Sequence, residues 1–580
     1  TAPAEYSTEP GVIIPVTGDL FKNKLRQRNN SEYYHMVDAY LSYDNTFNHH
    51  HIRGLVGFNY EQDYQKNLYS TMMDIQSNNL NDFNLGNHTE GVSLEGGQYE
   101  WALESFFGRV GYDWKGRYLA EVNLRWDASS RFRRDKRAAV FPSVSAGWRV
   151  SEEPFFAPIR NTFSNFKIRG SFGSLGNQAI SSPYPYIQTL DLLQQNYLVN
   201  GEFLTYASVS APTAGNFTWE TVVHGNLGLD LGFFNNRLTF AGDLYIRDTK
   251  DMLVPGKTLP GVYGAASPKE NAADLRTKGY ELTLSWNDKF NLAGKPFTYG
   301  VSFALGDNIS KITKYDNPTK DFNVSQYYEG MTIGEIWGYK IDGLFKTDEE
   351  AAAYQAEIDH SLIAKNILQT ATGKYKGLKA GDPKFVDLDG NGRIDDGEKT
   401  ANNRGDMRVI GNSRPRYNYS GSINLGWNGF DISAFFQGQH RYPDGNAMLF
   451  WGGYARPYSS FVPEHFLDDV WSEDNPDAYF PKLRGYAAQG DRHLAKVNNR
   501  YLQNTAYCRL KNLTVGYTLP VDLTRKARID RVRVYFSGDN LVTWTALKSK
   551  YIDPEQFSTD GSARVYPFAK TFSFGLDITF

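Results

Sequence analysis

The sequence predicts an all-β fold: a transmembrane antiparallel β-barrel with about fifteen strands and long extracellular loops. Three observations predict it. Aromatic residues make up 15% of the 580 residues, and the chain contains 53 glycines, which favours strands and turns over helices. Apolar and polar residues alternate along many short segments, as they do in a strand with two different faces. No segment approaches the roughly 18 consecutive apolar residues of a membrane-spanning helix.

The alternation is clearest at the end of the chain, where every second residue from Phe572 to Phe580 is apolar and the residues between them are polar or small. The same pattern runs through 118–126. At 423–436 two alternating runs are separated by Asn428-Gly429. Asn-Gly between alternating runs is the strongest short-range signal for a hairpin.

Read in this way, the sequence contains fifteen strands: 33–45, 51–61, 102–114, 117–127, 139–150, 166–175, 226–234, 237–247, 276–287, 297–308, 416–427, 430–440, 506–518, 531–538 and 571–580. Short connections lie around His49, Lys115-Gly116, Asn235-Asn236, Asp288 and Asn428-Gly429. Long connections lie between them: 62–101, 176–225, 248–275, 309–415, 441–505 and 539–570. Short turns at one end and long loops at the other are typical of outer-membrane barrels.

The two faces of the strands differ in a way that suits a membrane. One face is apolar and carries Tyr, Trp and Phe near the strand ends, as lipid and its interfacial aromatic girdles require. The other carries Asp, Arg, Asn and Gly, which suits a wet lumen. An ordinary sheet with one buried face is the alternative, but it gives no reason for loop asymmetry along the whole chain.

The number of strands carries a further expectation. Barrels of this kind have an even strand count, and an open fifteen-stranded edge would expose unpaired N–H and C=O groups to lipid. We therefore expect residues 1–580 to form the C-terminal portion of a larger barrel.

Composition excludes several classes. A single cysteine excludes a disulfide framework and any cysteine-based zinc site. A net charge of -3 gives no case for nucleic-acid binding. No spacing of nucleophile and base stands out, and no carboxylate pair can be singled out, so we do not expect an enzyme.

One motif carries specific chemistry. Within 376–404, the segment VDLDGNGRIDDGE begins at Val386 and matches an EF-hand calcium loop at every diagnostic position. Calcium takes six to eight oxygen ligands, and Gly392 permits the sharp turn between them. Asp395 would act through water. The predicted ligands are Asp387, Asp389, Asn391, the carbonyl of Arg393 and bidentate Glu398.

The flanking segments do not look helical, so we expect a single Ca²⁺ that stiffens an outer loop and not a sensor-type helix pair. A solvated acidic turn without metal is the alternative.

Two weaker signals could mark binding sites, but each also has an ordinary structural explanation. His49, His50 and His51 could bind a transition metal, but solvated residues of a turn are the commoner explanation. The aromatic residues Trp451, Tyr454 and Tyr458 could stack on sugars, pack within their loop or meet a partner.

Two further segments lie in the predicted loops. The basic cluster Arg131, Arg133, Arg134, Lys136 and Arg137 could meet an anionic surface or substrate, or be a solvated loop. Thr347 to Glu350 form a capping box that predicts a short helix in a long loop.

The sequence resembles the SusC/RagA-type TonB-dependent transporters of the outer membrane over nearly its whole length and in family order. The matching stretches are Arg117–Phe132, Phe141–Phe155, Lys167–Ile180, Trp219–Leu253, Ile333–Phe345, Tyr507–Pro520 and Tyr566–Phe580. The resemblance implies a 22-stranded barrel closed by an N-terminal plug. It implies a multi-pass protein of the outer membrane in which the plug and the TonB-contacting box are not among these residues.

The resemblance also implies a function. Such transporters import oligosaccharides, or in some members peptides, with energy delivered by the TonB complex and with a SusD-like surface lipoprotein as a lid. Loops 309–415 and 441–505 are the expected docking region. The alternatives are peptide import by the same class, a passive porin, and an outer-membrane enzyme or adhesin. Substrate-binding residues stay unknown at this point.

Overall fold

The computed structural model describes residues 4–6, 13–15 and 23–580, except 77–78, 90, 181–183, 195–196, 198, 200, 202, 211, 214, 216, 257–261, 263–266, 324, 326, 371–372, 374–375, 441–468, 483–495, 548–552 and 557–567. The chain forms two compact units. Unit 1 is Thr1–Tyr112, Glu121–Ser143 and Leu175–Glu220, and unit 2 is Asp113–Ala120, Val144–Ser174 and Thr221–Phe580. None of the described helices combines the length and the apolar character that a membrane crossing requires.

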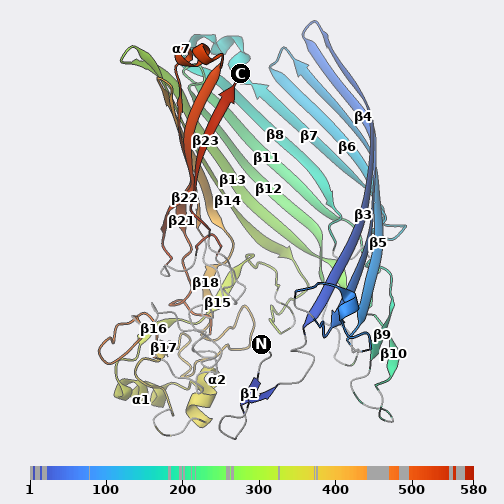
Figure 1. The fold of residues 1–580 in the computed structure, drawn as a ribbon, viewed down its shortest axis with the longest axis vertical. Helices are drawn as coiled ribbons and strands as arrows, with labels where there is room; N and C mark the ends of the chain where they lie inside the picture. Colours follow the sequence, from blue (N-terminus) through green and yellow to red (C-terminus); the bar gives the residue numbers. More distant parts are fainter. Residues whose placement is uncertain are drawn as a thin grey trace. The chain divides into compact units, whose positions relative to one another are not determined.

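The fifteen predicted strands are confirmed. They form one antiparallel sheet in which strands that follow one another along the chain lie side by side (Figure 1). These strands are β3 (Lys24–Phe47), β4 (His50–Met73), β5 (Ser93–Trp114), β6 (Tyr118–Ser129), β7 (Ala138–Arg149), β8 (Phe163–Asn177), β11 (Glu220–Phe233), β12 (Leu238–Pro255), β13 (Lys269–Leu292), β14 (Lys295–Lys314), β19 (Arg416–Trp427), β20 (Phe430–His440), β21 (Tyr507–Thr518), β22 (Arg531–Thr545) and β23 (Thr571–Thr579).

Among the described residues, eight short strands lie outside this sheet. They pair two by two: β1 (Ala4–Tyr6) with β2 (Ile13–Pro15), β9 (Leu190–Gln194) with β10 (Thr205–Val209), β15 (Glu335–Gly338) with β18 (Arg408–Asn412), and β16 (Ile341–Leu344) with β17 (Pro383–Phe385). The helices are also short: η1 (Phe83–Leu85), η2 (Val150–Glu152), η3 (Pro154–Ile159), α1 (Asp348–Glu357), α2 (Ser361–Lys365), η5 (Asn366–Thr370), α7 (Val521–Thr524) and η8 (Arg525–Ala527). The sequence predicted only α1 among all of these elements.

The tight turns follow from residues that tolerate a left-handed backbone. Asn428 and Gly429 have φ of 46° and 87°, and Trp427 pairs with Phe430 directly across them. The pattern is that of a two-residue hairpin whose twist matches the strands. The short turns lie at one end of the strands, and the long connections emerge at the other end (Figure 1).

One predicted turn is misplaced. The short connection expected around Asp288 lies five residues later, where Ala293 and Gly294 have φ of 49° and 75° and Leu292 pairs with Lys295. Asp288 sits inside the ladder, opposite Tyr299. Aspartate is common in turns, so Asp288 suggested one in the sequence. In the structure its carboxylate accepts a hydrogen bond from Arg237 Nη1 at 2.9 Å.

Several strands are longer than predicted. The pairing of β3 with β4 continues from Phe47 and His50 to Lys24 and Met73, far beyond the predicted end at residue 61. Their distal parts are mostly polar, so alternation no longer marks them. Backbone pairing nevertheless continues there, because it needs only a partner strand in register.

The sheet presents one apolar and one polar face. On the apolar face, Leu244, Leu284 and Phe303 are exposed although they are large and hydrophobic. Such residues stand at every second position of their strands, so a continuous apolar surface results. A surface of this kind fits lipid, because exposed apolar patches of this extent are rare on soluble monomers.

Candidate functional site

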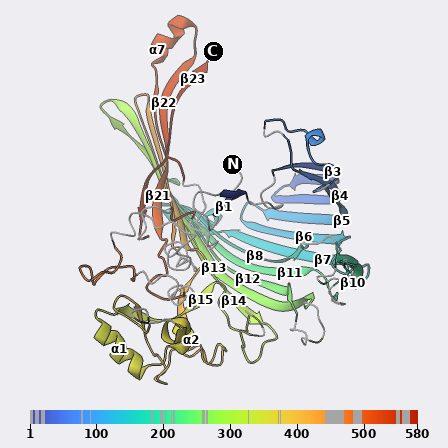
Figure 2. The same cartoon turned by 60° about the horizontal axis from the view of Figure 1, so that its bottom comes forward.

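The long connection after β14 folds into a compact structure of its own, which we call the loop module: residues 316–415 together with 469–505 in the parts that are described. It carries α1 and α2 (Figure 2) and the two small sheets that contain β15 to β18 (Figure 1). Its core is formed by Tyr339, Ile341, Phe345, Ala351, Ile363, Ala364, Ile367, Leu378, Phe385, Ile394, Phe480 and Tyr501. Residues far apart in the chain therefore build one core, and this core holds the acidic loop.

The predicted helix of the loop module is confirmed. Helix α1 begins after Thr347, whose hydroxyl accepts a hydrogen bond from the backbone N–H of Glu350 at 3.1 Å. The carboxylate of Glu350 accepts from the backbone N–H of Lys346 at 2.8 Å. These two bonds satisfy donors at the start of the helix, as a capping box does.

The acidic loop is closely wound around its first residue. Asp387 accepts backbone N–H groups of Gly390 and Gly392 at 2.7 and 2.8 Å, one on each carboxylate oxygen. Asp389 accepts from the backbone of Asn391 at 3.1 Å. Gly392 has φ of 77°, a conformation that favours glycine. The sharp turn that the motif requires at this position is therefore present.

Asp406 closes the loop from outside the motif. It is fully buried, and its two oxygens accept the backbone N–H groups of Leu388 and Asp395 at 2.6 and 2.8 Å. Carboxylate oxygens of Asp387, Asp389 and Asp406 lie within 4.8 Å of one another, the sole cluster of three or more metal-ligand side chains among the described residues.

The structure therefore brings only some of the predicted ligands together. Asp387 and Asp389 converge, and Asp406 joins them. Glu398 is exposed and outside this cluster. The side chain of Arg393 points to Asp359 at 3.8 Å, which leaves its carbonyl as the group that could serve as a ligand. Asp406 carries no signal in the sequence, because it follows the twelve-residue motif and only folding brings it back.

The electrostatics of the cluster are unequal. Burial raises the pKa of Asp406, and the charges of Asp389 and Asp387 raise it further. Burial also acts upward on Asp387, but the backbone N–H donors of Gly392, Gly390 and Asn391 hold its pKa below the ordinary value. A cation among these oxygens would offset the repulsion between the carboxylates. The donor set therefore fits a hard, oxygen-binding cation.

His49, His50 and His51 form no comparable cluster. His50 Nδ1 lies 2.8 Å from the hydroxyl of Tyr112, and His51 Nε2 lies 2.8 Å from Asp44 Oδ1. Both flank the turn at Asn48. This arrangement agrees with the interpretation of these histidines as turn residues.

The basic cluster is partly engaged within its own loop. Arg133 binds both oxygens of Asp135 at 2.6 and 2.5 Å, and this contact lowers the pKa of Asp135 to about 2. Arg131 packs over the ring of Trp101, with its guanidinium carbon 4.6 Å from the ring centre. The aromatic residues Trp451, Tyr454 and Tyr458 lie outside the described residues.

Ion pairs connect strands of the sheet in unit 2. On the polar face Arg169 contacts Asp230 and Asp243, and Arg533 contacts Asp431 and Asp577, with N–O distances between 2.6 and 3.2 Å. Arg416 contacts Asp307 at 2.6 Å, and Asp307 stands on the other face, opposite Tyr280. Each guanidinium group pairs with a carboxylate on another strand, so these ion pairs stabilise the sheet.

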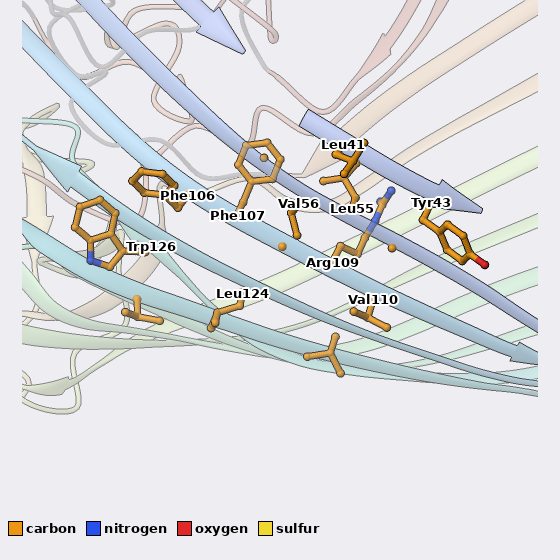
Figure 3. Close-up of a pocket in the computed structure, with 15 residues that line it drawn as sticks. Leu41, Tyr43, Leu55, Val56, Phe106, Phe107, Arg109, Val110, Leu124 and Trp126 are labelled. Carbon is orange, nitrogen blue, oxygen red and sulfur yellow. The ribbon is translucent and has the colours of Figure 1, made fainter. Parts of the chain in front are cut away.

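Unit 1 contains a hollow of about 830 Å³. Leu41, Val56, Phe106, Leu124 and Trp126 reach it from four neighbouring strands (Figure 3). It lies over small residues on the apolar face, and it offers hardly any polar group to a ligand. A hollow with this lining favours hydrocarbon chains over polar ligands.

Comparison with known proteins gives a consistent result. A family model described as "TonB dependent receptor-like, beta-barrel" matches residues 5–541. TonB-dependent receptor P3 of Formosa agariphila is 29% identical over 575 residues, which are 94% of this chain and 52% of that receptor. TonB-dependent receptor SusC of Bacteroides thetaiotaomicron is 28% identical over 490 residues, which are 82% of this chain and 44% of SusC. The chain spans about half the length of these curated relatives.

The fold is also shared with solved structures. The structure titled "Structure of the RagAB peptide transporter" superposes with a TM-score of 0.74 at 23% identity, over 96% of this chain and 56% of that chain. The same peptide importer in its open-open state gives a TM-score of 0.74 at 22% identity, over 100% of this chain and 57% of that chain. These likenesses show the strand arrangement.

Proposed function

Since the chain belongs to the TonB-dependent receptor-like β-barrel family, we propose that it is the barrel part of an outer-membrane importer of oligosaccharides, powered through TonB and paired with a SusD-like surface lipoprotein. The match over residues 5–541 carries this proposal. Family membership assigns the chain to the outer membrane and to a class of receptors and transporters, not of enzymes.

Two features support the finer parts of the proposal. The sequence resembles the SusC/RagA type, and a relative named SusC is 28% identical. The described part of the loop module has a hydrophobic core of its own, so it offers a partner protein a preformed surface. Peptide import is the alternative within the same class.

Uptake by intact cells tests the proposal. Cells that express the full-length protein with its partner lipoprotein are expected to accumulate fluorescently labelled neutral oligosaccharides. A protonophore or the loss of TonB is expected to abolish this accumulation, because energised transport depends on the proton-motive force. The measurement is cell-associated fluorescence over time, with cells that lack the protein as the control.

Other outcomes assign the other functions. Accumulation of labelled peptides but not of glycans would indicate the peptide alternative. Uptake that survives the protonophore, together with constant ion conductance of the purified protein in a planar bilayer, would indicate a passive porin.

We further propose that the acidic loop binds one Ca²⁺ through Asp387, Asp389, Asn391, the carbonyl of Arg393 and Glu398, with Asp406 as an added ligand or anchor. The convergence of three carboxylates and the wound loop support this proposal. The ion would tie together a turn whose acidic side chains otherwise repel one another.

Chelation tests the metal proposal. EDTA is expected to make segment 376–404 sensitive to protease, while the heat-modifiable gel shift of the barrel stays unchanged. The double variant Asp387→Ala/Asp389→Ala is expected to show this sensitivity without EDTA and to lower Ca²⁺ affinity at least tenfold in titration calorimetry. Glu349→Gln, an exposed acid of the same module, is the matched control. If the protease sensitivity of segment 376–404 is the same with EDTA and with added calcium, the proposal is contradicted.

A further inference from the structure

The hollow of about 830 Å³ in unit 1 lies on the apolar face of β3 to β7, and we call it the outer hollow. Glycines form its floor. A Cβ atom built at Gly54 meets only Tyr43 Cβ at 3.9 Å, and one built at Gly108 meets nothing nearer than Leu55 O at 3.7 Å. The space above both glycines is therefore open. The volume falls within the range of about 300–1,000 Å³ that is usual for small-molecule sites.

A row of aromatic rings forms one side of the outer hollow (Figure 3). Phe58, Phe106 and Trp126 come from β4, β5 and β6, and the centres of neighbouring rings are 5.1 and 5.7 Å apart. Val56 and Leu124, which line the hollow, lie two residues from this row towards the short turns. The long connections begin on the other side of the row. In barrels of this kind, aromatic rings gather where the lipid layer meets water.

The basic cluster lies just beyond this row. Strand β6 ends at Ser129 and β7 begins at Ala138, so the cluster lies in the connection between them. Val140 lines the outer hollow and follows Arg137 by three residues. A strand rises about 3.3 Å per residue, so the backbones of these two residues lie within about 10 Å of each other. The cluster and the hollow are therefore neighbours.

The connection is packed on the face opposite the outer hollow. Phe132 is completely buried, with its ring centre 4.9 Å from that of Trp219. Trp219 also packs against Phe141, with ring centres 5.5 Å apart. Phe141 follows Val140 in β7 and so stands on the other face of the sheet from the hollow. These apolar contacts fix the connection while its charged side chains stay at the surface.

The connection carries an excess of positive charge. Residues 131–137 include five basic residues and one acidic residue, Asp135, which is paired with Arg133 at 2.5 Å. Within the described part of the chain, Arg134 and Lys136 are exposed, and neither side chain forms an ion pair or a hydrogen bond. Glu104 is an exposed acid on the apolar face of β5, so the cations still outnumber the acids.

An apolar hollow beside exposed cations matches a lipid with an anionic head group. The hollow accepts acyl chains, because polar groups lose hydration there without gaining partners. Lys and Arg next to a membrane surface attract phosphate groups of lipids. A soluble anion would contact the cations and leave the hollow empty, and an uncharged lipid would leave the cations without a partner. A phosphorylated lipid uses both features.

We propose that the outer hollow and the basic cluster together bind one molecule of phosphorylated glycolipid, the lipid class of the outer leaflet of the outer membrane. Its acyl chain lies over Gly54 and Gly108, and its phosphate binds Arg134 and Lys136. The long connections mark the outer end of the strands, so the cations stand on the side of that leaflet. This inference rests on the outer-membrane location that family membership assigns and not on the imported cargo.

Native mass spectrometry of the purified, lipid-depleted full-length protein tests this site. The probes are diphosphoryl lipid A, the same lipid A without phosphates, and dipalmitoyl phosphatidylglycerol, which is anionic but is not a glycolipid. The unaltered protein is expected to bind one molecule of diphosphoryl lipid A and to bind the two other lipids about tenfold more weakly or worse.

Two variants separate the two parts of the site. Arg134→Gln/Lys136→Gln is expected to weaken binding of diphosphoryl lipid A about tenfold and to leave binding of the dephosphorylated form unchanged. Gly108→Leu places a side chain in the hollow and is expected to weaken binding of both forms. The open space at Gly108 means that this substitution does not strain the sheet. The heat-modifiable gel shift checks that each variant forms the barrel.

Matched controls lie elsewhere in the chain. Arg525→Gln/Lys526→Gln removes two exposed cations from η8, in the short connection between β21 and β22. Gly170→Leu alters a glycine next to Arg169 of the polar face, so position 170 is on the apolar face, and a Cβ atom there meets nothing nearer than Asn226 O at 3.7 Å. Both controls are expected to bind diphosphoryl lipid A as the unaltered protein does.

The outcomes decide the inference. Weaker binding of diphosphoryl lipid A in both site variants but in neither control supports the site. Equal binding by all variants overturns it, because the lipid is then part of the general lipid layer around the barrel. Equal binding of phosphatidylglycerol and diphosphoryl lipid A by the unaltered protein overturns the assignment to a glycolipid. If Gly108→Leu instead converts a dimer into single copies, the hollow is an interface between two copies, and the inference is overturned.

Discussion

Replacing Phe345 by alanine is expected to destabilise the loop module by about 3–5 kcal/mol. Its side chain is completely buried in the core of the module and packs against Tyr354 with ring centres 5.6 Å apart. Removal of the ring leaves a cavity, because the backbone is held in place: Phe345 N–H donates to Asp382 O at 3.0 Å, and Gly381 N–H donates to Phe345 O at 2.8 Å. Native-state hydrogen exchange of peptides from 340–406 measures the loss.

The control for this substitution lies in the same module. Leu362 is 49% exposed, so Leu362→Ala is expected to change stability by no more than about 0.5 kcal/mol. The gel shift of the barrel is expected to be the same in both variants, because the module holds a core of its own. Loss of the barrel shift in Phe345→Ala would show that the module and the sheet fold as one unit.

Replacing Arg509 by methionine is expected to cost about 3–5 kcal/mol of local stability. The Arg509 side chain is 1% exposed and donates to Asp553 Oδ2 at 2.5 Å, Glu555 Oε2 at 2.9 Å and Thr543 Oγ1 at 2.9 Å. Methionine has similar volume but leaves Asp553 with no cation in a poorly hydrated place. Hydrogen exchange in β21 and β22 is expected to accelerate.

Two further variants isolate the cause of this effect. Arg509→Lys keeps the charge but not the planar fork that reaches three partners, so only part of the stability is expected to return. Arg531→Met removes an exposed arginine from β22 and is expected to change little. Equal hydrogen-exchange rates in Arg509→Met and Arg531→Met would show that the ion pairs of Arg509 do not stabilise β21 and β22.

The strands of the sheet could be predicted because their signal is local. Alternation from Tyr118 to Trp126 or from Phe572 to Phe580 reflects a face in lipid and a face in water, and each residue reports its own face. The misplaced turn at Asp288 marks the limit of this signal: a polar residue inside a ladder looks like a turn until its pairing with Tyr299 is known.

The acidic loop shows the same division. Its ligand types and spacing are written in twelve consecutive residues, so the motif could be found without a structure. Asp406 could not, because it lies outside these twelve residues and stands beside Asp387 only in the folded loop module, whose core is built from distant parts of the chain.

The sequence by itself determined the all-β class, the fifteen strands, the two faces and the acidic motif, since each depends on neighbours along the chain. Only the tertiary structure decided what lies opposite what. Thr283, Ala304 and Ser420 come from three different strands, and they stand in one row across the sheet only because of the register in which those strands pair. Register is a property of paired strands, and a one-residue slip would turn every one of these side chains to the other face.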